Sequence, residues 1–403
     1  MLPKKVFYIW NYLEWGGAQV YFFGLMNEMK NYSDVLAIMP SGSNEQLLKF
    51  LHNLQIPCEF FDSHTDTKPA PTFARKLQRH WNKIYCEFVM LKYLNKFDFS
   101  DSVIHIEIAP WQSLFALLWL CRKAKVFVTV HNSILPIPKH RYFIWLAKFG
   151  ILARMKNFHI FTANNDARES LKMLVPEDFF QKIKVTHAYI NPQEINQALH
   201  TKINRNEMCE KYNLPKDKFL VFCVGQFIDR KGRWIFLEAA AKLKQTNDDI
   251  AFVWISNSKP SNMDLEKAKI FGLGKDFVFI TSEQVGREHI DLFNLLRVAD
   301  VFSLPSYIEG LPISLLEAMA LGIPSVSTDI NGIPEAIKHL ETGYLIAPGA
   351  VKELKNAIQT LKDDSTLRER LSKNGREFIL TNFSEEVVAK IAAENYIESF
   401  DRN

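Results

Sequence analysis

Two glutamates that lie eight residues apart are the most informative ionisable pair in this 403-residue chain. Glu309 and Glu317 belong to the segment 305–337, PSYIEGLPISLLEAMALGIPSVSTDINGIPEAI. The run DVFSLPS predicts the end of a strand, EGLPI a tight turn and SLLEAMALG a helix. A helix N-terminus after such a turn can bind a phosphate or sugar oxygen, because its first N–H groups are unpaired and its dipole is positive. The turn comprises Glu309, Gly310, Leu311, Pro312 and Ile313.

A second loop, VGQFIDRKG at 224–232, follows a predicted strand and carries two adjacent cations, Arg230 and Lys231. A cation placed beside a departing diphosphate stabilises the negative charge that develops on it. A lysine after a strand is more often a solvated surface residue. The loop is therefore a candidate phosphate-binding site mainly because the same chain also carries the two glutamates.

The first half of the chain holds weaker candidates. Gly16 and Gly17, in LEWGGAQVYFF, stand between the first predicted strand and a helix, where glycines allow a close backbone approach. His131, in VFVTVHNS, follows a strand and can hydrogen-bond a hydroxyl group. His105, in VIHIEIAP, is a weaker second histidine candidate.

Short apolar runs that alternate with helical segments predict an α/β protein with two doubly wound parallel sheets. We place a first Rossmann-like domain at 1–196 and a second at 197–384, with the helix at about 385–403 packed back on the first. Two such domains would face a central cleft at the carboxyl ends of their strands, where open α/β folds bind ligands. The predicted strands are KVFYIW, DVLAIM, VIHIEI, KVFVTV, FHIFTA, KIKVTH, FLVFCV, IAFVWI, FVFITS, DVFSLP, PSVST and GYLIA.

Composition restricts the class of protein. Hydrophobic residues make up 47% and charged residues 23% of the chain, which is typical of an ordered globular protein. The five cysteines are scattered without C-x-x-C spacing, so we expect neither disulfides nor a zinc cluster, and a reducing, cytoplasmic location. No apolar run reaches the roughly 18 residues of a spanning helix. The sequence also lacks D-x-D, H-E-x-x-H, G-x-S-x-G and the P-loop motif, and we expect a site without a metal.

Taken in order, the glycine loop, the strand-end histidine, the lysine loop and the E-x7-E segment resemble the retaining glycosyltransferases of family 4, which have the GT-B fold. The resemblance implies transfer of a hexose-type sugar from a UDP- or GDP-linked donor to an acceptor hydroxyl, with no cofactor. It implies catalytic roles for Glu309, His131 and Lys231. Glu309 would contact the sugar and Glu317 the ribose. The implied donor-binding set is Gly16, Gly17, Gln226, Arg230, Lys231, Glu309, Gly310, Leu311, Pro312, Ile313 and Glu317.

One position departs from the family pattern. The family has an arginine where this chain has Gln226, and Arg230 is a possible substitute. This departure is the best argument for one alternative, a nucleotide-sugar-binding subunit without activity. A second alternative, a GT-B nucleotide-sugar epimerase that acts without an acceptor, also stays open.

The charge is unevenly distributed, although the net charge is only +4. Residues 68–165 hold 15 Lys and Arg against four Asp and Glu, and they interleave these cations with aromatic residues. Helices of this composition can lie on an anionic membrane surface, although aromatic stripes often pack inward instead. No nucleic-acid-binding module is recognisable. We predict a peripheral membrane protein with a lipid-linked or glycan acceptor, which acts in bacterial surface polysaccharide or lipid-linked glycan assembly.

Overall fold

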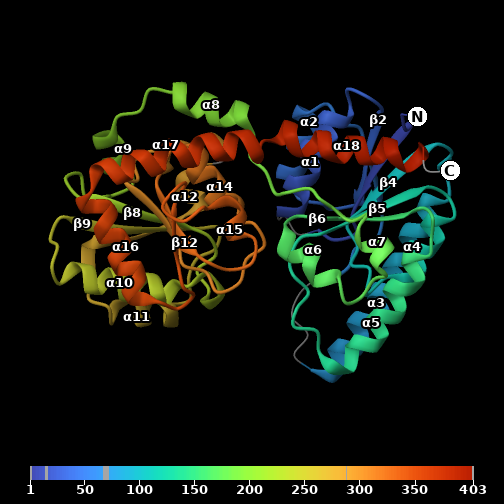
Figure 1. Cartoon of the computed structure of the whole chain (residues 1–403), viewed down its shortest axis with the longest axis horizontal. Coiled ribbons are helices and arrows are strands. Elements are labelled where there is room, and N and C mark those ends of the chain that lie inside the picture. The colour runs from blue at the N-terminus through green and yellow to red at the C-terminus, as the bar shows by residue number, and fades with distance from the viewer. Residues whose placement is uncertain (1, 14–16, 67–71, 287, 402–403) are drawn as a thin grey trace. The chain divides into compact units, whose positions relative to one another are not determined.

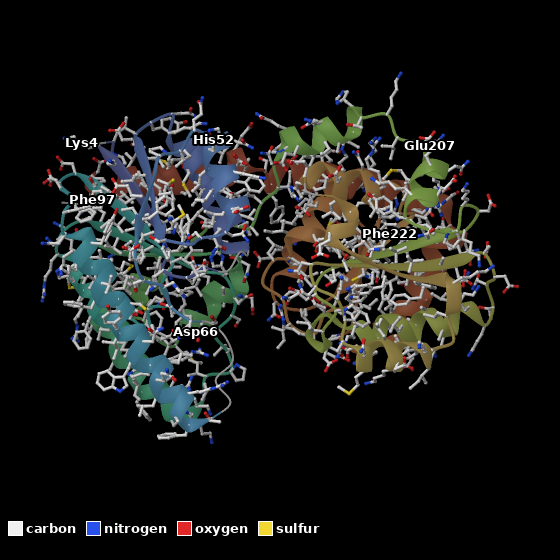
Figure 2. All side chains as sticks on the ribbon, turned by 180° about the vertical axis from the view of Figure 1, so that it is seen from behind. Lys4, His52, Asp66, Phe97, Glu207 and Phe222 are labelled. Carbon is white, nitrogen blue, oxygen red and sulfur yellow. The ribbon has the colours of Figure 1, made fainter. Side chains whose placement is uncertain are left out.

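The computed structural model describes residues 2–13, 17–66, 72–286 and 288–401. The chain divides into two compact units, each with a hydrophobic core of its own. Unit 1 comprises Met1–His187 and Glu385–Asn403, and unit 2 comprises Ala188–Ser384. In Figure 2, Phe222 lies inside unit 2 and Glu207 at its periphery, as their burial and exposure require.

Unit 1 is built on a seven-stranded parallel sheet in the order β3-β2-β1-β4-β5-β6-β7 (Figure 1). The order reverses direction between β1 and β4, which makes the carboxyl ends of these strands the topological switch point of the sheet. The sequence predicted all of these strands except β3, a four-residue edge strand that contains the polar Glu59. The strands are β1 Lys5–Ile9, β2 Asp34–Pro40, β3 Cys58–Phe61, β4 Ser102–Ile106, β5 Lys125–Val130, β6 Phe158–Thr162 and β7 Lys184–Val185.

The helices of unit 1 cross over between its parallel strands, as this topology requires. The C-terminal helix α18 packs on α1 (Figure 1). They are α1 Gly17–Met29, α2 Glu45–Asn53, α3 Phe73–Leu94, α4 Leu114–Cys121, α5 Lys139–Ala153, α6 Asn165–Leu171, α7 Glu177–Phe180 and α18 Glu385–Asp401.

Tyr396 anchors α18 in the core of unit 1. Its hydroxyl lies 2.6 Å from Nδ1 of His105, and its ring packs edge-on against Phe127. The other ring nitrogen of His105 lies 2.8 Å from the hydroxyl of Thr129. Burial lowers the pKa of His105 well below its usual range, and nearby His131 adds to this effect. His105 is thus a neutral, fully hydrogen-bonded core residue, and its interpretation as a second site candidate is wrong.

Unit 2 repeats the architecture with a six-stranded parallel sheet in the order β10-β9-β8-β11-β12-β13. Its switch point lies between β8 and β11. All six strands were predicted, because strands covered on both faces read as nearly continuous apolar runs. The strands are β8 Phe219–Val224, β9 Ile250–Ser256, β10 Phe277–Thr281, β11 Val301–Leu304, β12 Ser325–Thr328 and β13 Tyr344–Ile346.

The helices of unit 2 include two single-turn 3-10 helices, η1 and η2. Helix α10 packs on α16, and α14 packs on α17. The full set is α8 Pro192–His200, α9 Arg205–Lys211, η1 Asp229–Lys231, α10 Arg233–Lys244, α11 Asn262–Lys269, η2 Gly274–Asp276, α12 Ser282–Val285, α13 His289–Leu296, α14 Ile313–Ala320, α15 Ile333–Ala336, α16 Val351–Asp363 and α17 Ser365–Asn382.

The boundary between the units lies after residue 187, whereas the sequence placed it after residue 196. The polar segment NPQEINQALH, which the sequence places at the break between the domains, forms helix α8, which Asn191 caps through the N–H groups of residues 193 and 194. The apolar side of α8 joins the core of unit 2 through Ile195 and Ala198. Arg297 also donates to the carbonyl of Ala198, so α8 belongs to unit 2.

Candidate active site

The loops that follow β8 and β11 meet at the switch point of unit 2. The first loop is 225–232 and the second is 305–312, and the N–H of Tyr307 donates to the carbonyl of Arg230 at 2.8 Å. The two segments that the sequence singled out are therefore neighbours, although about 80 residues separate them along the chain.

Lys231 and Glu309 form a buried ion pair across these loops. The Nζ of Lys231 lies 2.6 Å from Oε1 of Glu309, and only 13% and 5% of these side chains are exposed. The hydroxyl of Ser306 donates to the same oxygen at 2.6 Å. A buried carboxylate needs compensation of this kind, because the loss of hydration costs several kcal/mol.

Arg230 supplies a second, more exposed cation at this pair. Its guanidinium lies 3.7 Å from Oε2 of Glu309 and donates to the carbonyl of Ile308 at 3.2 Å. Gln226, at the position of the family's arginine, has an exposed side chain. Of the two candidates for the arginine role, Arg230 is the one that contacts Glu309.

Gly232, which the sequence did not single out, permits this close approach. It has a left-handed φ of +75°, and a Cβ on it would overlap the carbonyl oxygen of Pro305. Any other residue would both strain the backbone and push the two loops apart. The glycine was visible in the sequence, but its contact with Pro305 was not.

The turn before α14 differs in one respect from the prediction of free backbone amides. The N–H of Glu309 donates to Oδ1 of Asn331 at 3.3 Å, so this amide has a protein partner. Leu311 and Pro312 are buried, and the eight-residue helix α14 begins at Ile313. The N-terminus of α14 therefore lies directly after the loop that carries Glu309.

Glu317 lies in the middle of α14 and is almost completely buried. Its Oε1 lies 3.0 Å from Nε2 of His289, the first residue of α13. The sequence analysis missed His289, because nothing in the local sequence marks it as a partner of Glu317.

In unit 1, His131 follows β5 and faces Glu107, which follows β4. The Nε2 of His131 lies 3.2 Å from Oε2 of Glu107, and 23% and 18% of these side chains are exposed. The sequence missed Glu107, although an acidic residue directly after the apolar strand VIHI was a visible signal. Gly17 is the first residue of α1, and Gly16 lies outside the described residues.

Part of the chain, which includes this site in unit 2, matches a known protein family. Residues 204–378 match the family described as "Glycosyl transferases group 1". The matched segment contains Lys231, Glu309 and Glu317, so the ion pair and the buried helix carboxylate lie within it.

Several curated relatives of the chain are named for the transfer of a sugar. The chain is 33% identical over 198 residues to an alpha-D-kanosaminyltransferase of Streptomyces kanamyceticus, covering 49% of this chain and 50% of that protein. It is 27% identical over 216 residues to a UDP-Gal:alpha-D-GlcNAc-diphosphoundecaprenol alpha-1,3-galactosyltransferase of Escherichia coli, covering 51% and 54%. The chain thus spans about half the length of these relatives.

Solved structures match over nearly the whole chain. A glycosyltransferase of Rickettsia africae superposes with a TM-score of 0.75 at 18% identity, covering 99% of both chains. The Anabaena protein HepE in complex with UDP gives a TM-score of 0.74 at 15% identity, covering 98% of this chain and 100% of that one. The predicted fold class, two Rossmann-like α/β domains of the GT-B type, is confirmed.

Within the described residues, no group of three or more His, Cys, Asp and Glu side chains is placed to hold a metal ion. Lys231, Arg230 and Glu309 place charged side chains at the switch point of unit 2.

Proposed function

We propose that this protein is a retaining glycosyltransferase that moves a hexose-type sugar from a nucleoside diphosphate sugar to an acceptor hydroxyl. The observation that carries the proposal is the buried Lys231–Glu309 pair at the switch point of the group 1 domain. Ligands of open α/β folds bind at this place, and the pair supplies both a cation for phosphate and a carboxylate for sugar hydroxyls.

Lys231 can serve the donor while it remains paired. An ammonium group has three N–H donors, and the bond to Glu309 uses one of them. The remaining donors bind the diphosphate, whose negative charge grows as the bond to the sugar breaks. Arg230, 3.7 Å from Glu309, adds a second cation on the solvent side and takes the place of the family's arginine.

The carboxylates bind the sugar and the nucleoside. Glu309, held by Lys231 and Ser306, receives hydroxyls of the transferred sugar, and Glu317 receives the ribose. The start of α14 and the adjacent turn residues Gly310 to Ile313 face the diphosphate. Hydrogen bonds to charged groups of this kind contribute about 1.5–3 kcal/mol each.

Unit 1 supplies the acceptor side of the reaction. His131, held by Glu107, binds a hydroxyl of the acceptor or of the sugar. Gly16 and Gly17 belong to the donor-binding set in this proposal. The leaving phosphate takes the acceptor proton in a front-face attack, so the sugar keeps its anomeric configuration without a protein nucleophile.

The donor is UDP- or GDP-linked, and the acceptor is lipid-linked or a glycan in bacterial surface polysaccharide assembly. HepE was solved with UDP, and the E. coli relative is named for a diphosphoundecaprenol acceptor. A capsular polysaccharide glycosyltransferase of Staphylococcus aureus is a further relative, 24% identical over 248 residues.

The central test is turnover with UDP- and GDP-sugars and a bacterial lipid-linked acceptor extract, with and without EDTA. We expect release of the nucleoside diphosphate, retention in the product, and full activity in EDTA because protein cations replace the metal. Complete loss of activity in EDTA that Mg²⁺ or Mn²⁺ restores would contradict metal independence. Donor binding without turnover would favour the non-catalytic subunit, and conversion of donor alone would favour the epimerase.

A surface on unit 1 supports a reaction at the membrane. We call it the basic-aromatic surface, and it is made of residues 73–88 of α3 and 139–144 of α5. Residues 72–81 are all exposed, and the buried residues of α3 lie in its second half. Phe73, Trp81 and Phe143 are 82%, 63% and 76% exposed. These aromatic rings therefore do not pack into the core, which was the alternative interpretation of the stripe.

The exposed apolar residues of α3 follow a helical spacing of three or four, so they share one face. Helix α5 adjoins α3 through the segment before α4, because Lys83 donates to Gln112 and Lys148 to the carbonyl of Trp111. The exposed apolar residues are Phe73, Leu77, Trp81, Ile84, Tyr85, Phe88, Phe143 and Ile144. The cations among them are Arg75, Lys76, Arg79, Lys83, Lys139 and Arg141.

This surface docks the protein on anionic lipid in the cytoplasm, with aromatic rings among the acyl chain tops and cations on the headgroups. In the described residues no helix is long and apolar enough to cross a membrane. Sedimentation with phosphatidylglycerol vesicles should show binding that falls as salt rises. Lys76→Glu with Arg79→Glu should weaken it more than tenfold, because each cation near such a surface contributes about 1 kcal/mol.

A matched control changes the same charge on unit 2. Lys352 and Lys373 are exposed residues of α16 and α17, so reversing both alters the net charge equally. Equal loss in the two double variants, or no binding of the wild type at low salt, would exclude docking through the basic-aromatic surface.

A further inference from the structure

His289 bridges two carboxylates that come from different helices of unit 2. Its Nε2 lies 3.0 Å from Oε1 of Glu317 on α14, and its Nδ1 lies 2.7 Å from Oε2 of Glu194 on α8. The imidazole ring also packs against Phe293, with ring centroids 4.3 Å apart. Both ring nitrogens and one face of His289 are therefore engaged.

The bridge requires a charged imidazole. A carboxylate oxygen only accepts hydrogen bonds, so each ring nitrogen must carry a proton to donate to its partner. Burial alone would lower the pKa of His289, but the charges of Glu317 and Glu194 and their hydrogen bonds outweigh it and raise this pKa to about 10. His289 is thus a cation at neutral pH between two carboxylates.

Glu317 needs this partner more than Glu194 does. The side chain of Glu317 is 8% exposed, whereas that of Glu194 is 35% exposed and can be hydrated. An unpaired carboxylate at the position of Glu317 would lose its hydration without compensation, and it would turn away or take up a proton. His289 holds one of its oxygens, Oε1, and so fixes where the other oxygen points.

We propose that His289 is a positioning residue for the nucleotide: through Glu317 it orients the carboxylate oxygen that receives a ribose hydroxyl. The inference rests on the proposed function, in which Glu317 binds the ribose. Glu194 in turn fixes the ring orientation of His289 from α8. A purely structural role, a tie between α13, α14 and α8, makes a different prediction, because it would not depend on the ribose hydroxyls.

The experiment is calorimetric titration with UDP and GDP and with their 2′-deoxy and 3′-deoxy forms. The variants are Glu317→Gln, His289→Leu, His289→Gln and Glu194→Gln, and thermal unfolding of each reports whether it folds. His339→Leu is the matched control, because His339 is an exposed histidine of unit 2 whose Nδ1 accepts a hydrogen bond from the N–H of Leu345 rather than facing a carboxylate.

For the wild type we expect the better-bound nucleotide to lose about tenfold in affinity when one ribose hydroxyl is removed, as for one hydrogen bond to a charged group. His289→Leu should weaken the ribonucleotide about tenfold and leave the deoxynucleotide unchanged, so the ratio of the two affinities falls towards one. His289→Gln, which can donate to one carboxylate only, and Glu194→Gln should give smaller losses in the same direction.

The outcomes separate the two hypotheses. If neither nucleotide binds the wild type, or if Glu317→Gln binds both forms as the wild type does, the proposed ribose site fails and the inference fails with it. If Glu317→Gln abolishes the preference for ribose while folded His289→Leu and His289→Gln keep it, the proposed function stands and the role of His289 is overturned. Equal losses for ribo- and deoxynucleotides would likewise show a structural role only.

Discussion

Each unit places a basic side chain beside a carboxylate at the carboxyl ends of its strands, but the two pairs differ in distance and exposure. In unit 2, Lys231 and Glu309 lie 2.6 Å apart with exposed fractions of 13% and 5%. In unit 1, His131 and Glu107 lie 3.2 Å apart with exposed fractions of 23% and 18%. The same topology thus carries a closed ion pair in one unit and a more open pair in the other.

This difference in exposure and distance predicts different roles for the two pairs. A buried pair with a third partner, Ser306, is held in one geometry and suits the stabilisation of a charge that develops at a fixed place. A pair that remains partly open can exchange its partner for a substrate hydroxyl. We therefore expect substitutions to cost most in unit 2 and less in unit 1.

The largest effect should follow loss of the unit 2 pair. Lys231→Met and Glu309→Gln should each lower turnover at least about a hundredfold, comparable with the loss of one preorganised electrostatic contact. Lys231→Met should also destabilise the fold by about 3 kcal/mol, because it leaves Glu309 buried with less compensation. Steady-state kinetics and urea unfolding measure both quantities. Near-normal turnover in folded variants would remove this pair from the active site.

The close approach of the loops gives the second prediction. Gly232→Ala places a Cβ on the Pro305 carbonyl in addition to straining a φ of +75°. Gly272→Ala is the matched control, because Gly272 has a φ of +66° and a Cβ there would meet nothing within 4 Å. We expect about 1 kcal/mol of destabilisation for Gly272→Ala. For Gly232→Ala we expect about 3 kcal/mol and a tenfold lower turnover, because the loops must also separate.

Equal unfolding midpoints for these two glycine variants would contradict the argument, since only the backbone strain is common to them. A loss of stability in Gly232→Ala with normal turnover would show that the loop spacing does not control the Lys231–Glu309 pair.

Local sequence predicted the described strands except β3 and singled out Lys231 and Glu309, because strand ends, turns and a short spacing are properties of neighbouring residues. It was not sufficient for contacts made across the sheet. Gly232 meets Pro305, 73 residues away, and His105 meets Tyr396 on the returning C-terminal helix. His105 therefore looked like His131 in sequence, although one is a core residue and the other lies at the sheet edge.

The same limitation explains the missed partners Glu107 and His289 and the boundary after residue 187. Glu107 and His131 follow separate strands, and only the order β4-β5 in the sheet makes them neighbours. The sequence placed α8 at the break between the domains because its polar residues outnumber Ile195 and Ala198, the residues buried in unit 2. An apolar pattern predicts that a helix face is buried, but it does not identify the unit in whose core that face lies.

A smaller effect is expected in unit 1. Glu107→Gln keeps the shape but removes the charge that holds His131, so we expect turnover to fall about tenfold while the unfolding free energy changes by less than about 1 kcal/mol. His131→Gln with intact Glu107 is the companion variant. If Glu107→Gln costs as much turnover as Glu309→Gln, the proposed division between a fixed and an open pair is wrong.

The free energy of unfolding should also depend on pH through His289 of unit 2. His131 faces one carboxylate, whereas His289 faces two, and the charges of Glu317 and Glu194 outweigh burial and raise the pKa of His289 to about 10. An unfolded histidine has a pKa near 6.5, so the stabilisation from His289 is complete below about pH 6.5 and is lost as the pH rises through about 10. Because 36% of the side chain is exposed, solvent screens its interactions with the two carboxylates, and we expect them to stabilise the fold by only about 1–2 kcal/mol.

Urea unfolding of the wild type and His289→Gln at pH 6, 8 and 9.5 should show a stability difference that shrinks with rising pH. A difference that is constant or grows over this range would mean that His289 is not charged between its two carboxylates.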